Sequence, residues 1–146
     1  MDYPIEPYVG VGPIHFGMAV DEVHTAVGGE THPFRKGPKA TRDTDAFDEL
    51  GLHVSYEDSG VCNAVELWGA TMPTWNGHPL LMRPFQEVHD LLGNADPSLQ
   101  VHDTGLTSLA LGIGIYVESL VDWETDTQDW DQDTEGVIVF ERGYYG

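Results

Sequence analysis

The chain has 146 residues, in which 25 Asp and Glu face only 6 Lys and Arg, and its formal net charge is −19. This length suits one domain with its own core, so we expect a single domain over residues 1–146. Because phosphate binding depends on Lys and Arg, the charge disfavours nucleic acid and anionic membranes as direct ligands and favours a basic protein partner.

The sequence carries no sign of export or of membrane insertion. Met1 to Glu6 lacks the basic start and apolar stretch of a signal peptide, and no apolar run approaches the roughly 20 residues of a membrane span. We therefore expect a cytoplasmic protein. The single cysteine, Cys62, has no second thiol with which to form a disulfide, a zinc site or a redox motif, and is expected to be a small buried hydrophobe.

The first predicted helix covers Val20 to Gly28. Its apolar residues Val20, Val23 and Val27 recur at spacings of three and four, which places them on one face. Gly28 suits the left-handed residue that ends a helix. After a polar stretch, alternating apolar residues predict strands at 52–56 and 64–68, joined by a short hairpin turn at 57–60.

A segment rich in turn residues, Gly69 to Pro79, links this part to a second copy. Within the linker we expect Met72 and Trp75 to dock at the junction, because a loose tether needs neither. The second helix, Phe85 to Gly93, aligns on the first without gaps, and both contain Glu-Val-His and end in Gly. Pro84 fits its first turn.

Two further strands are expected after the second helix, at 113–117 and 136–140. Here the tight turn of the first copy is replaced by a long acidic insert, roughly Ser119 to Glu135. The predicted class is therefore α+β, with two tandem helix-plus-antiparallel-hairpin repeats that form one pseudo-twofold domain. Repeat one covers about 10–69, the linker about 70–79, and repeat two about 80–146.

The segment Gly12-Pro13-Ile14-His15-Phe16-Gly17-Met18, followed by Asp21-Glu22-Val23 and Gly28, resembles tandem-repeat proteins related to the secreted β-lactamase-inhibitor protein. Its Phe-Gly-Met entry to a helix is also similar to the small lipoprotein domain of outer-membrane assembly factors. The resemblance implies short helices on antiparallel strands and binding of another protein by a concave sheet and its loops.

The chain departs from this family at three points. Ala19 replaces the hydroxyl residue that caps the helix, although Glu22 keeps the other half of the capping box. Residues 81–84 of the second copy have lost the Phe-Gly-Met pattern. The two disulfides of the inhibitor are absent, which is consistent with a reducing compartment.

The insert holds the predicted partner-binding residues. Seven acids and two Trp occur in the fourteen residues from Asp122 to Glu135. Trp is enriched at interface hot spots, and carboxylates around it steer a cationic partner. The partner-binding residues that we predict are Trp123, Asp126, Asp129, Trp130, Asp131 and Asp133. The alternative is that both indoles fold back onto the sheet.

The sequence offers little for a metal, a cofactor or catalysis. Asp131, Asp133 and Glu135 match the start of a calcium loop, but the twelfth position is Arg142 where a bidentate Glu is needed. The seven histidines form no pair at metal-ligand spacing, and no serine lies in a nucleophile elbow. We expect no metal, no cofactor and no enzyme activity. The basic residues near 35–42 are expected to pair with nearby acids.

The favoured function is that of an inhibitor or immunity protein, which occludes the basic surface of a partner such as a nuclease-like toxin. An alternative stays open, because proteins of very saline cytosols also carry acidic surfaces. On that reading the chain is a halophile-adapted structural or small-ligand-binding domain, and its acidity serves hydration only.

Overall fold

The computed structural model describes residues 2–145, and within them strands dominate: 40% of the chain is strand and 13% is helix. The helices are α1 (Val20–Val27) and α2 (Phe85–Ala95). The strands are β1 (Asp2–Glu6), β2 (Gly10–Val11), β3 (Ile14–His15), β4 (His32–Phe34), β5 (Thr44–Phe47), β6 (Leu52–Tyr56), β7 (Cys62–Leu67), β8 (Met72–Trp75), β9 (His78–Pro79), β10 (Gln100–His102), β11 (Gly105–Ser108), β12 (Ile113–Tyr116), β13 (Val121–Asp122), β14 (Thr127–Gln128) and β15 (Gly136–Phe140).

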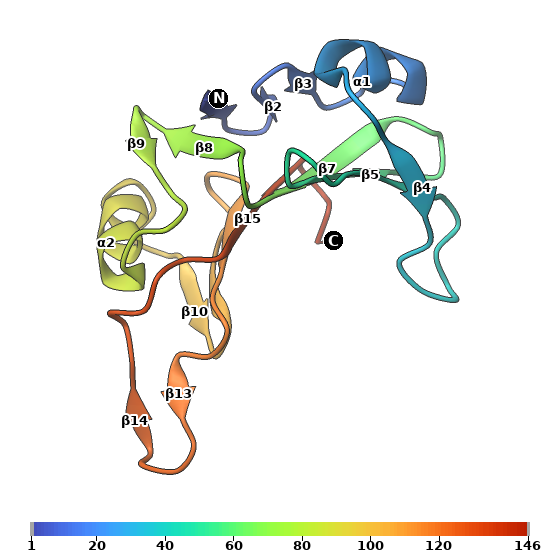
Figure 1. Cartoon of the computed structure of the whole chain (residues 1–146). Coiled ribbons are helices and arrows are strands. Elements are labelled where there is room, and N and C mark those ends of the chain that lie inside the picture. The colour runs from blue at the N-terminus through green and yellow to red at the C-terminus, as the bar shows by residue number, and fades with distance from the viewer. Residues whose placement is uncertain (1, 146) are drawn as a thin grey trace.

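An eight-stranded antiparallel sheet, in the order β10-β11-β12-β15-β7-β6-β5-β4, is the main element. Its central pair joins distant parts of the chain, since Val139 of β15 lies opposite Val65 of β7. The sheet is bent, and both helices lie on its outer side while the C-terminus lies in the inner angle (Figure 1). We call its two surfaces the outer face and the inner face.

A second sheet has the order β3-β2-β1-β8-β9. β1 pairs in parallel with β8, with Tyr3 opposite Pro73, although some 70 residues separate them in sequence. In Figure 1 this sheet lies on the same side of the large sheet as the helices. Its buried residues Tyr3 and Val11 belong to one hydrophobic core with buried residues of the large sheet.

The core fills the space between the outer face, the helices and the second sheet. Alternate residues of the central strands point into it, such as Val54, Val65 and Val139, each with no exposed surface. The helices contribute Val23 from α1, and Phe85, Val88 and Leu92 from α2. Because strand residues alternate between faces, Glu66, Gly114 and Ile138 lie on the inner face.

The predicted fold class was wrong. The chain is mostly β and not an α+β pair of helix-plus-hairpin repeats: each half contributes four strands to the large sheet, and a five-stranded sheet stands outside the expected scheme. The physical reason lies in the additional strands. β4, β5 and β10 are short and rich in polar residues, so they lack the alternating apolar pattern by which a strand is recognised.

Several local predictions were confirmed. Both helices and the four apolar strands are present, and Gly28 takes the left-handed φ of 72° at the end of α1. Cys62 is fully buried, and Trp75 packs against the core. Two predictions were wrong: Gly93 lies inside α2 and does not end it, and Met72 is 41% exposed. Neither described helix has the length and hydropathy to span a membrane.

Candidate functional site

Residues 118–135, which we call the acidic arm, connect β12 to β15. They contain eight carboxylates and no Lys or Arg. The small hairpin of β13 and β14, with Asp122 opposite Thr127, extends away from the sheet (Figure 1). At its turn Trp123 is 75% exposed, and Asp126 has a left-handed φ of 55°. The arm therefore presents a free indole among uncompensated negative charges.

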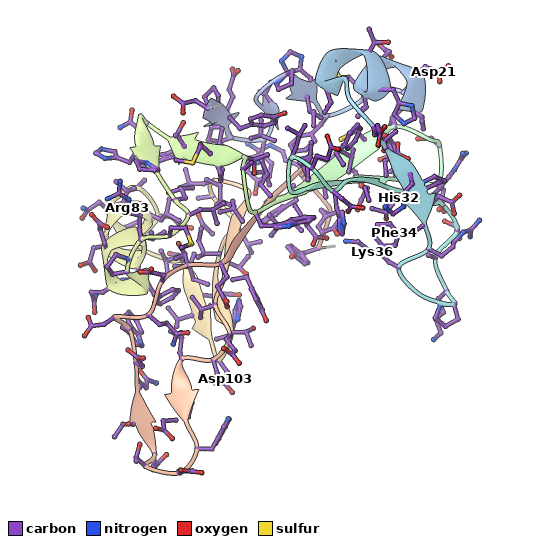
Figure 2. The ribbon with its side chains drawn as sticks, in the orientation of Figure 1. Asp21, His32, Phe34, Lys36, Arg83 and Asp103 are labelled. Carbon is purple, nitrogen blue, oxygen red and sulfur yellow. The ribbon has the colours of Figure 1, made fainter. Side chains whose placement is uncertain are left out.

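The base of the arm is fixed by backbone hydrogen bonds. The N–H groups of Val117 and Leu120 donate to the carbonyls of Thr104 and Asp103, at 2.9 and 2.7 Å. Asp103 lies at the β10–β11 turn, beside the place where the arm leaves the sheet (Figure 2). Inside the arm, Gln132 donates from Nε2 to the carbonyl of Ser119 at 2.5 Å. Only the hairpin beyond this base is free of the sheet.

The returning leg of the arm caps α2. The helix has no side-chain cap, so the N–H groups of its first turn need other acceptors. Phe85 donates to the carbonyl of Gln132 and Gln86 to that of Trp130, both at 2.9 Å. The arm thus replaces the capping side chain that the sequence lacks.

Trp130 packs against this helix. Its ring lies 5.0 Å from that of Phe85 and 4.8 Å from that of His89, both in edge-to-face geometry, and Phe85 is fully buried. The indole N–H donates to Gln128 Oε1 at 3.0 Å. Trp130 therefore anchors the arm, which is the alternative that the sequence left open for both indoles.

The predicted partner-binding residues thus separate into two kinds. Trp123, Asp126, Asp129, Asp131 and Asp133 are exposed on the arm, whereas Trp130 is partly buried on α2. The exposed residues are available to a partner as predicted, and their role in binding stays a prediction. Trp130 packs on α2, and its predicted role in binding is not tested by this packing.

A groove of about 740 Å³ crosses the inner face next to the arm, and the sequence alone did not reveal it. We call it the inner groove. Its lining includes Gly114 and Gly136, on the neighbouring strands β12 and β15, which contribute no side chains of their own. Glycine within a strand often marks close approach of a ligand or another backbone. The side chains around it include Glu66, Trp68, Tyr116, Glu118, Glu135, Ile138 and Tyr145.

Aromatic rings continue from the groove toward β4. The His53 ring lies 4.4 Å from that of Trp68 and 4.8 Å from that of Phe34. Burial lowers the pKa of His53, so its ring is neutral at pH 7. Phe34 and Lys36 lie along the inner side of this part of the chain (Figure 2), and Lys36 pairs with Glu66. The inner face thus presents a row of aromatic rings, Phe34, His53 and Trp68, next to the carboxylates that line the groove.

A buried polar cluster lies on the outer face. Asp45 is only 5% exposed, accepts a hydrogen bond from the Tyr56 hydroxyl at 2.7 Å, and lies 2.7 Å from His24 Nε2. Burial and the neighbouring carboxylate raise the pKa of Tyr56, which keeps its proton on the hydroxyl. Because His24 belongs to α1, the cluster ties that helix to the sheet, and we assign it a structural role.

Of the basic residues near 35–42, Arg35 and Lys36 pair with acids as expected, whereas Arg42 bonds a backbone carbonyl. Arg35 Nε lies 2.7 Å from Asp43 Oδ1, and Arg42 donates to the carbonyl of Asp58. Among residues 2–145 no group of three or more His, Cys, Asp or Glu side chains is arranged to hold a metal ion. Burial raises the pKa of Cys62 to about 12, so this thiol is not a nucleophile at neutral pH.

Comparisons with known proteins found no match, whether with models of protein families, with curated sequences or with solved structures. The resemblance to the β-lactamase-inhibitor family stays a prediction. The arm and the groove are therefore the features from which a function is inferred.

Proposed function

We propose that this chain is a non-enzymatic binding protein that occludes a basic surface of a partner protein, such as a toxin, in the manner of an inhibitor or immunity protein. The observation that carries the proposal is the acidic arm. Its exposed Trp123 lies on a hairpin that extends away from the sheet, and its carboxylates at 118 and 135 line an open groove.

The charge of the arm supports a cationic partner. In the described part of the chain, the acids that contact a Lys, Arg or His side chain are Asp43, Asp45, Asp48, Glu66 and Asp90, and none of them belongs to the arm. Like charges so close together repel one another, and a basic surface would relieve that repulsion on binding. Such complementarity speeds association and rejects acidic competitors.

The exposed indole supports a protein partner rather than a small ion. Trp123 buries little of its ring within the chain, and Trp is the residue most enriched at interface hot spots. Its hairpin is held at the base by the bonds to Asp103 and Thr104, so little conformational freedom need be lost there on binding. The resemblance to an inhibitor family is consistent with this mode of action.

The test is affinity capture from the native cell extract with three forms of the full chain. One form neutralises the arm with Asp126→Asn, Asp129→Asn, Asp131→Asn and Asp133→Asn. Its matched control neutralises four exposed acids far from the arm, through Asp2→Asn, Glu6→Gln, Glu30→Gln and Glu49→Gln.

The proposal predicts that the wild type and the control retain one basic protein, which the arm variant loses. The purified pair is then measured by calorimetry. Equal loss in both variants would mean that total charge and not the arm attracts the protein, and would contradict the proposal.

The second candidate is a halophile-adapted domain whose acidity serves hydration only. It is favoured by one observation, that most of the 25 acidic residues lie outside the arm. Thermal unfolding across salt concentration separates the two functions. A fold that requires molar salt, together with no partner that depends on the arm, supports hydration and removes the inhibitor proposal.

A further inference from the structure

In the inner groove Tyr116 and Trp68 stand on either side of Gly136, and we call the position between them the slot. Gly136 forms part of its floor and lies directly across from Tyr116, while Trp68 lines the groove from β7's end. One strand over, Gly114 lies opposite Ile138. Two aromatic residues thus flank Gly136, whereas the Ile138 side chain covers Gly114, where an added Cβ would lie 2.6 Å from Ile138 Cγ2.

The mouth of this slot beside the arm is negative. Glu118 and Glu135, at the two ends of the acidic arm, line the groove and are exposed. Glu66 also lines it, but pairs with Lys36. Glu135 is held in place because its N–H donates to the carbonyl of Tyr116 at 2.9 Å. Within residues 2–145 neither Glu118 nor Glu135 forms an ion pair, so both carboxylates are available to a cation from a partner.

We infer that the inner groove receives an arginine side chain of the partner, an inference that rests on the proposed function and names the chemistry of its contact. A guanidinium is planar and always charged, stacks on aromatic faces, and presents a fork of donors that matches carboxylates. Trp68 and Tyr116 supply the faces, and Glu118 and Glu135 supply the acceptors. The arm lies next to the groove, so one basic surface engages both.

The first experiment titrates the full chain with N-acetyl-argininamide and follows backbone amide and Trp indole signals by NMR. N-acetyl-citrullinamide, which has the same shape but no charge, and N-acetyl-lysinamide serve as comparison probes. Saturable shifts confined to Gly114, Tyr116, Gly136 and the Trp68 indole are expected with the arginine probe. Equal affinity for the citrulline or the lysine probe would overturn the assignment of a guanidinium site.

Two variants test the parts of the site. Glu118→Gln with Glu135→Gln raises the Kd of the arginine probe about fivefold, as expected for the loss of two exposed ion pairs. Gly136→Leu fills the floor and abolishes saturable binding. A Cβ at this position lies 3.7 Å from Tyr116 Cβ, an ordinary contact, and far-UV circular dichroism checks that the variant is folded before it is titrated; Gly136→Ala, which adds that Cβ alone, should weaken binding less.

The steric control is Gly37→Leu, because an added Cβ there meets nothing within 4 Å and the residue does not line the groove. It should bind the probe like the wild type. Unchanged probe affinity in Gly136→Leu would overturn the inference.

The two proposals fail separately. If the arginine probe does not bind while the arm variant still loses its protein in the capture experiment, the guanidinium site is wrong and the proposed function stands. If the probe binds as described while captured proteins do not depend on the arm, the groove is a cation site and the proposed function is wrong.

Discussion

We expect Trp130 of the acidic arm to stabilise the fold and Trp123 to bind the partner. Replacing each by alanine should therefore change stability in one variant and binding in the other. Trp130 packs on Phe85 and His89 at 5.0 and 4.8 Å, whereas Trp123 is 75% exposed. Trp130→Ala should therefore destabilise the fold. Trp123→Ala should leave the free energy of unfolding within about 0.5 kcal/mol, as is usual for exposed positions.

The magnitude for Trp130→Ala follows from its burial. Truncating a fully buried Trp costs about 3–5 kcal/mol, and half of that applies to a partly buried ring. The aromatic pairs are included in this loss, since each contributes about 1 kcal/mol. We expect a loss of about 2 kcal/mol, which lowers the urea midpoint by about 1 M if the denaturant slope is about 2 kcal/mol/M.

The assay is urea unfolding followed by far-UV circular dichroism, which does not depend on tryptophan fluorescence. Capture of the partner is measured on the same preparations, in conditions where both variants are folded. Trp123→Ala should weaken capture and Trp130→Ala should not, once the fraction folded is taken into account. A loss below about 0.5 kcal/mol for Trp130→Ala, or an equal loss for Trp123→Ala, would refute the division of roles.

Three further predictions concern the rest of the chain. Tyr56→Phe removes a buried donor to Asp45 and should cost about 1 kcal/mol in urea unfolding, with His24 still in place; no change would show that the cluster does not tie α1 to the sheet. Cys62, whose pKa burial raises to about 12, should react with a thiol reagent only after unfolding, and rapid reaction of the native chain would contradict its burial. Burial lowers the pKa of His53, so the unfolded chain binds more protons than the folded chain between the two pKa values. The stabilisation is fully present above the unfolded pKa of about 6.5 and is lost as pH falls through the folded pKa; an NMR titration that places the pKa of His53 at or above 6.5 would contradict this.

The sequence predicted the elements whose side chains follow a regular period. Val20, Val23 and Val27 mark α1, and the alternation from Leu52 to Tyr56 marks β6, because burial of one face imposes those spacings. The sequence did not predict the strands that are short or whose buried residues are polar. Thr44 and Asp45 of β5 are buried, and the partners of Asp45, Tyr56 and His24, are distant in sequence, which no local pattern records.

The site was only partly predictable for a similar reason. The composition of the insert identified an acidic segment, but only the packing on Phe85 distinguishes Trp130 from Trp123. The inner groove arises when the register brings Gly114 and Gly136 onto neighbouring strands. Single glycines within predicted strands were the available signal, and they acquire meaning only once the strand order is known.

We propose that the acidic arm and the inner groove form one surface that binds a basic protein. Hydrogen exchange of the full chain, free and in complex with the protein captured from its native extract, tests this most directly. We expect new protection in residues 114–118, 121–128 and 135–138, with exchange unchanged in α1. Protection confined to the outer helices or to the five-stranded sheet would contradict it.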